Sequence, residues 1–216
     1  MHFHLPKPLH GWREFAGEVG IIVIGVLIAL AAEQLVEEWQ WHRKVDVVRK
    51  ALMGELANDR ARWEVDMIAA RCANREIDKL DQWAQAGGTG PPPAGVSVNP
   101  GDFFWMHSAN WTLATGSQTL DHFPINEQLA LASLYDGVTH RQVDIITASD
   151  LGQRVDGLMP VATDDQGRRE LRAALGTLKM RIAALTSNDA YMRRHFDAVG
   201  VRPDRSDFSA DIHTCG

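Results

Sequence analysis

The sequence predicts an all-α protein in which a single N-terminal transmembrane helix continues into a long helix and is followed by a helical bundle. An unbroken apolar run covers residues 19–32, and no proline follows it until Pro91. No later stretch shows the strict alternation of a strand. The expected divisions are an N-terminal tail (1–14), a transmembrane helix (15–36), a long juxtamembrane helix (37–86), a Pro/Gly linker (87–101), the remaining helices of the bundle (102–200) and a loose C-terminal tail (201–216).

The apolar run has the length of a membrane span. Extended to residues 15 and 36 it contains about 22 residues, which at about 1.5 Å per residue crosses the ~30 Å hydrocarbon core. Trp12 precedes it, and Trp39 and Trp41 follow it, where interfacial aromatic belts occur. We therefore expect a single-pass protein of the bacterial inner membrane, with the lipid bilayer as one partner.

A cleaved signal peptide is the main alternative for this segment. Lys7 and Arg13 would be its charged start, and residues 29–31 (Ala-Leu-Ala) would be its cleavage site. Cleavage would release a periplasmic protein. However, Glu14 and Glu18 lie where signal peptides usually lack acid, and the helical pattern continues through the cleavage site. The sequence therefore favours a retained anchor.

The charges on either side of the span give opposing indications of its orientation. Lys7 and Arg13 precede the span, and acidic residues come first after it, which favours a cytoplasmic N-terminus and a periplasmic bundle. A strict count of Lys and Arg favours the opposite orientation, because four basic residues follow the span: Arg43, Lys44, Arg49 and Lys50. We expect the periplasmic bundle and leave the opposite orientation open.

One face of the predicted span carries mostly small residues. Its members recur at intervals of three and four residues, and we call them the small-residue stripe: Glu18, Ile22, Gly25, Ala29, Ala32 and Val36. Small residues let helices approach closely in lipid. We expect an interface with a second copy or another membrane protein, with Glu18 turned into it. Alternatively, Glu18 lies among the headgroups, where the positive end of the helix dipole favours it.

Helical spacing continues beyond the span and predicts one helix to about Gln85. Its apolar positions include Leu52, Leu56, Trp63, Ile77 and Leu80. Polar residues between the apolar ones, among them Glu55, Asp59 and Arg62, are expected on a solvated face.

Further helices follow the Pro/Gly linker. An aromatic-rich short helix should reach about Thr115, with Phe103, Phe104, Trp105 and Trp111 as core anchors. Asn126 is expected to cap a helix that ends at Met159, before Pro160. A capping box at residues 163–166 should open a final helix that ends at Gly200. Its apolar residues follow strict helical spacing: Leu171, Leu175, Leu178, Ile182 and Leu185.

No common catalytic, nucleotide-binding or metal-binding motif is present, including H-E-x-x-H, G-x-x-x-x-G-K-[ST], G-x-G-x-x-G, C-x-x-C and G-x-S-x-G. We expect no catalytic, cofactor-binding or metal-ligating residues and no enzyme activity. The net charge of −6 lies entirely in residues 33–216, which argues against a nucleic-acid partner.

The two cysteines, Cys72 and Cys215, are a candidate disulfide if the bundle faces an oxidising compartment. The alternative is one buried thiol and one thiol in the tail.

The anchor resembles that of a family of bacterial single-span proteins of unknown function. In that family a Gly-Glu pair precedes an apolar run with an I-G-x-x-I-A-L pattern, and a Trp follows shortly afterwards. The corresponding residues here are Gly17, Glu18, Ile24, Gly25, Ile28, Ala29, Leu30 and Trp39. A second set, Trp111, Gly116, Ser117, Leu120 and Tyr135, is also similar, although the family usually has Ser-Gly where this chain has Gly-Ser. The resemblance implies a retained anchor and no particular activity.

The leading functional hypothesis is a non-enzymatic membrane-anchored interaction or accessory protein that uses the small-residue stripe and the helix after it. An extracytoplasmic small-molecule-sensing module, working with a separate output partner, is the alternative. A ligand pocket lined by Trp105, Trp111 and Tyr135 would favour sensing. A solid bundle with an exposed apolar helix face would favour interaction. An enzyme of unfamiliar design is a third hypothesis.

Overall fold

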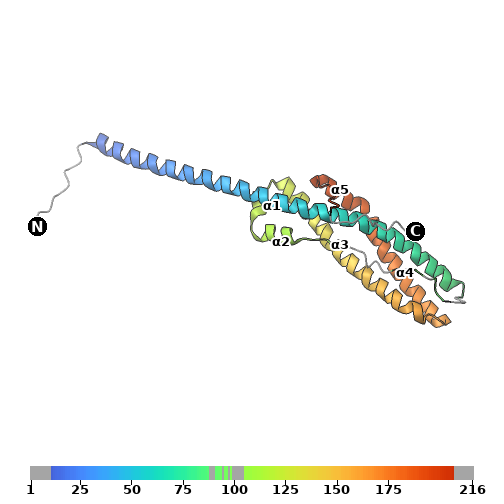
Figure 1. The fold of residues 1–216 in the computed structure, drawn as a ribbon. Coiled ribbons are helices and arrows are strands. Elements are labelled where there is room, and N and C mark those ends of the chain that lie inside the picture. The colour runs from blue at the N-terminus through green and yellow to red at the C-terminus, as the bar shows by residue number, and fades with distance from the viewer. Residues whose placement is uncertain (1–10, 88–90, 94, 97, 99–104, 207–216) are drawn as a thin grey trace, which may run out of the picture. The chain divides into compact units, whose positions relative to one another are not determined.

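The computed structural model describes residues 11–87, 91–93, 95, 96, 98 and 105–206, and over these it is helical without strands. The elements follow in order (Figure 1): α1 (Trp12–Gln85), α2 (Ala109–Gly116), the 3₁₀ turn η1 (Thr119–His122), α3 (Ile125–Leu158), the 3₁₀ turn η2 (Met159–Val161), α4 (Asp165–Ser187) and α5 (Asp189–Val199). The predicted all-α class is confirmed, as is the end of the first helix at Gln85. Contacts divide the chain into two compact units, Met1–Val47 and Val48–Gly216.

The described part of the first unit consists almost entirely of the first half of α1. This helix contains a stretch that is long and apolar enough to cross a membrane. Its most apolar 18-residue window has a mean hydropathy of 2.4, and none of that window is buried. Such a surface is unfavourable in water, at about 25 cal/mol per Å², whereas lipid tails are equally apolar. Length and composition therefore agree with the predicted span at 15–36.

The second unit is built on the part of α1 after Val48, which runs beside α3 and α4 (Figure 1). Apolar residues recur at every third or fourth position of this part, so they form one stripe that must pack against other helices to be shielded from water. Leu52, Leu56, Trp63, Ile77 and Leu80 on this stripe are all buried, as the helical spacing predicts.

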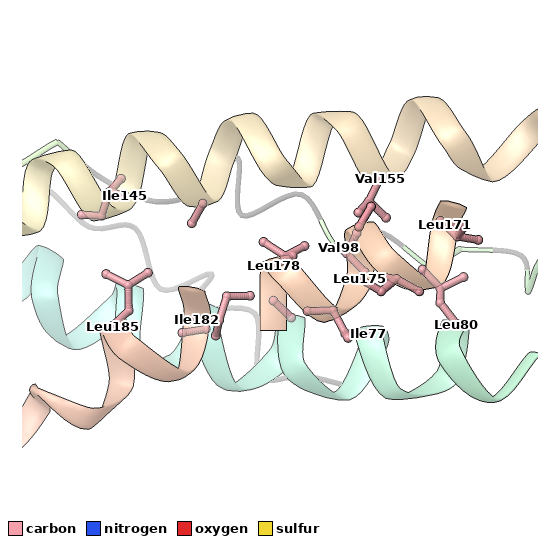
Figure 2. Close-up of a cluster of buried hydrophobic side chains, with 14 of the residues drawn as sticks. Ile77, Leu80, Val98, Ile145, Val155, Leu171, Leu175, Leu178, Ile182 and Leu185 are labelled. Carbon is pink, nitrogen blue, oxygen red and sulfur yellow. The ribbon is translucent and has the colours of Figure 1, made fainter. Parts of the chain in front are cut away.

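Three helices share the core of the bundle (Figure 2). Ile77 and Leu80 of α1 meet side chains of α4, and α3 covers them from the other side. The α4 residues are the five whose spacing predicted a buried face: Leu171, Leu175, Leu178, Ile182 and Leu185.

The structure corrects the prediction for the start of α3. The helix begins at Ile125, and Pro124 is its N-cap, so Asn126 lies inside the first turn and does not cap the helix. The carbonyl of Pro124 accepts from the backbone N–H groups of Glu127 and Gln128 at 2.9 and 3.0 Å. The end at Leu158, two residues before Pro160, lies within one residue of the predicted end.

The expected final helix is in fact two helices. Asp164, not Thr163, caps α4, because its Oδ1 accepts from the backbone N–H of Gly167 at 2.7 Å. The helix then ends at Ser187, and α5 begins at Asp189 after the junction residue Asn188. The Trp63 indole N–H donates to Asp189 Oδ1 at 2.9 Å, which ties the first turn of α5 to α1.

The segment expected to be a loose tail is attached to α1 at its beginning. Val201 is 4% exposed, and its carbonyl accepts from Arg60 Nη1 at 2.5 Å. The backbone N–H of Asp204 donates to the Ala57 carbonyl at 3.0 Å. The prediction is therefore wrong for residues 201–204, while residues 207–216 lie outside the described part of the chain.

Leu178→Ala should lower the free energy of unfolding by about 2–5 kcal/mol, because Leu178 is fully buried in the three-helix core and its truncation leaves a cavity. Met180→Ala is the matched control, since Met180 is 69% exposed on the same helix and should change the value by less than about 0.5 kcal/mol. Urea denaturation of both variants in detergent measures the difference. Equal effects would contradict this core.

Candidate functional site

The small-residue stripe lies on α1 within the first unit, and all six of its residues are exposed. Its C-terminal end borders a shallow hollow lined by Ala32, Glu33, Val36, Glu37 and Gln40. A Cβ added at Gly25 would meet nothing within 4 Å. The face is therefore open to a neighbouring helix, and whether one occupies it stays a prediction.

The aromatic residues considered as a ligand pocket pack in a different way. The Trp111 ring stacks on the Tyr135 ring at 4.8 Å between centroids and 14° between planes. Tyr135 is 1% exposed, whereas Trp105 is 60% exposed. Because Trp111 and Tyr135 contact each other directly, no ligand fits between their rings. Phe103 and Phe104 lie outside the described residues.

A cluster of polar side chains joins α1 to residues 105–107, which precede α2, and to Asn110 in α2. Glu55 and Asp59 lie one turn apart on α1, and both accept hydrogen bonds from backbone N–H groups of this segment. Glu55 Oε2 accepts from the backbone N–H of Asn110 at 2.9 Å. Its other oxygen accepts from the Tyr135 hydroxyl of α3 at 2.8 Å. Tyr135 therefore connects the aromatic stack to the carboxylates of α1.

Asp59 is the centre of this cluster and is 0% exposed. Both carboxylate oxygens accept from the backbone N–H of His107, at 2.9 and 3.0 Å. Arg62 Nη1 lies one turn away and donates to the Trp105 carbonyl at 2.5 Å. The backbone N–H of Met106 donates to Gln142 Oε1 of α3 at 3.1 Å. Residues 105–107 are thus fastened to two helices by side-chain acceptors and donors.

Burial dominates the electrostatics of the cluster. The pKa of Asp59 is raised to about 7 in all: burial raises it most, the His107 N–H and Arg62 lower it, and the nearby Glu55 carboxylate also raises it. Burial and Glu55 also raise the pKa of the Tyr135 hydroxyl above its ordinary value, so this group remains a hydrogen-bond donor. A carboxyl with this pKa can exchange a proton near neutrality, but its burial separates it from any substrate. Its chemical role is to fasten residues 105–107.

The expectation that Glu55 and Asp59 lie on a solvated face is wrong, because Asp59 is fully buried and Glu55 is half-buried. Asp59 follows Leu56 by three residues and precedes Trp63 by four, so it lies on the buried stripe itself. This spacing is the feature of the sequence that could have predicted the burial of Asp59. An acidic residue on an apolar stripe needs a donor from another segment.

A second buried charge was also missed. Arg141 of α3 is 4% exposed and lies over the Trp63 ring, with its guanidinium carbon 5.2 Å from the ring centre. Asp144 Oδ2 is 3.3 Å from its Nη1. Burial lowers the pKa of Arg141, and Asp144 opposes that shift. The contact of Arg141 with the Trp63 ring connects α3 to α1 within the core.

Within the described ranges no group of three or more His, Cys, Asp or Glu is gathered so as to hold a metal ion. Cys72 is half-buried on α1, and Cys215 lies outside the described residues. The Cys72–Cys215 disulfide therefore stays a prediction.

No protein-family model, curated protein or solved structure matches this chain. The resemblance of the anchor to a family of single-span proteins therefore stays a prediction that rests on the residues given above.

Asp59→Asn should remove a pH dependence of stability. The folded-state pKa is raised from 3.8 to about 7, so between those values the folded protein keeps a proton that the unfolded chain releases. Wild-type stability should therefore fall, relative to the variant, as the pH rises through this window, by up to about 4 kcal/mol. The Asn amide oxygen can still accept from His107.

Denaturation of the full chain in detergent, at several values between pH 4 and pH 8, measures this difference. Asp150→Asn is the control, because it makes the same substitution at an exposed position on α3. Parallel wild-type and Asp59→Asn curves would contradict the proposed burial.

Proposed function

We propose that this chain is a non-enzymatic membrane-anchored interaction or accessory protein of the bacterial inner membrane. The observation that carries the proposal is the contrast within α1. Its most apolar window has no buried residue, whereas the same helix after Val48 has its apolar stripe covered by the bundle. The first part has the composition of a lipid-facing helix, and the second part that of a helix in a globular domain.

The small-residue stripe is the surface that we propose for association, with a second copy or with another membrane protein. Gly25, Ala29 and Ala32 offer little side-chain volume, so two helix backbones can approach closely along this face.

The packing of the aromatic residues supports association over ligand sensing. A sensing pocket would need space next to Trp111 and Tyr135, and these two rings are stacked on each other. If the intact mass of the purified protein were that of a chain starting after Ala31, it would instead indicate a released periplasmic protein.

For orientation, we propose a cytoplasmic N-terminus and a periplasmic bundle. Lys7 and Arg13 before the span support this orientation, and the predicted Cys72–Cys215 disulfide agrees with it, because disulfides persist in the oxidising periplasm.

Gly25→Ile should weaken self-association or the association with a membrane partner, because the larger side chain separates the backbones at the stripe. Gly20→Ile is the matched control, since Gly20 lies off the stripe on the same helix. A Cβ added at either position meets no atom within 4 Å in the single chain, so we expect both variants to fold.

Crosslinking in native membranes, followed by purification in detergent, measures the associated fraction for the two variants. We expect a several-fold loss for Gly25→Ile and no change for Gly20→Ile. Equal behaviour of the two variants would remove the stripe as the interface.

Mass spectrometry without reduction, on protein from its native host, should find the peptides of Cys72 and Cys215 linked. The linkage requires an oxidising compartment, so it also tests the proposed orientation. Two free thiols would contradict the disulfide and remove its support for a periplasmic bundle.

A further inference from the structure

Two cations directly after the apolar stretch are held against tryptophan rings. The guanidinium carbon of Arg43 lies 5.0 Å from the centre of the Trp39 ring. The ammonium nitrogen of Lys44 lies 4.3 Å from the centre of the Trp41 ring. Each contact joins a residue to one three or four positions earlier on α1, so both cations lean back towards the apolar stretch, as helical side chains do.

This lean decides the level at which the two charges lie. Measured along the helix axis from Val36, the last residue of the predicted span, Trp39 is about 4.5 Å and Trp41 about 7.5 Å further on. The headgroup layer of one leaflet is about 5–7 Å thick. The Arg43 and Lys44 backbones lie at about 10 to 12 Å, beyond that layer, and without the lean their charged groups would lie there too. Stacking on the rings brings both charges back to the level of the lipid phosphates.

Neither charge is neutralised within the described part of the chain. Arg43 and Lys44 have no acidic partner there, whereas Arg49 and Arg60 further along α1 pair with Glu127 and Asp197. Glu33, Glu37 and Glu38 precede these two residues on α1, so Arg43 and Lys44 are the first basic residues after the apolar stretch. A cation on the face of an aromatic ring keeps its outer side open to an anion.

We propose that Trp39, Trp41, Arg43 and Lys44 form a collar that binds the phosphate groups of anionic phospholipid headgroups. The proposal rests on the membrane span proposed above. The tryptophans lie at the interface and position the cations, and the cations attract the anionic lipid. Each cation near a charged membrane surface contributes about a fivefold preference for anionic lipid.

The test uses the full chain, reconstituted into vesicles of phosphatidylcholine mixed with phosphatidylglycerol. After gentle extraction, native mass spectrometry measures the ratio of the two lipids that remain on the protein. We expect this ratio to exceed the ratio in the vesicle. The double variant Arg43→Gln/Lys44→Gln should lower it by about fivefold for each cation removed.

Arg71→Gln/Arg75→Gln is the matched control, because it removes the same charge from two exposed positions further along α1 and should leave the ratio unchanged. If the wild type shows no enrichment of phosphatidylglycerol, or if the Arg43/Lys44 variant keeps it, the collar is overturned. Either result leaves the proposed membrane span intact. Enrichment abolished by free inorganic phosphate at constant ionic strength would overturn it in favour of a site for soluble anions. A wild-type chain that does not insert into the vesicles would overturn the span and the collar together.

Discussion

The apolar stripe of α1 after Val48 is the constraint on which the bundle depends. A single helix cannot bury its own face, so Leu52, Leu56 and Trp63 need cover from other parts of the chain. Burial of each such side chain contributes about 1.5–3 kcal/mol. Further along the stripe, α3 and α4 pack against Ile77 and Leu80, and the first turn of α5 is tied to α1 through Trp63 and Asp189. The beginning of the C-terminal segment is held by Arg60 of α1.

Covering the stripe also buries charge. Asp59 lies on the stripe, so the chain that covers it must supply hydrogen-bond donors, and the His107 backbone N–H does so. The price is a carboxyl group whose pKa is raised to about 7. Glu55 is bonded to the Tyr135 hydroxyl and to the Asn110 backbone, and Tyr135 stacks on Trp111. The Trp111–Tyr135 stack and the hydrogen bond from Tyr135 to Glu55 thus attach α2 and α3 to α1.

The same helix presents two kinds of surface. Residues 19–32 are apolar on every side, whereas the part after Val48 is apolar on one side only. Lipid accepts the first kind of surface, and a protein core requires the second. The proposed functions use this difference. Association along the small-residue stripe and binding of anionic headgroups at the tryptophan collar are both proposed for the part of α1 before Val48.

Local sequence patterns determined the all-α class, the end of α1 at Gln85 and the buried face of α4, because helical period and apolar composition are properties of the nearby residues alone. The stripe, the disulfide and the family resemblance remain predictions from those patterns. Tertiary structure decided the burial of Asp59, whose donor comes from a residue 48 positions away. It also decided the break at Asn188 and the attachment of Val201, since both depend on contacts with α1. Periodicity shows which face of a helix is apolar, but only the folded chain shows which polar residues that face buries with it.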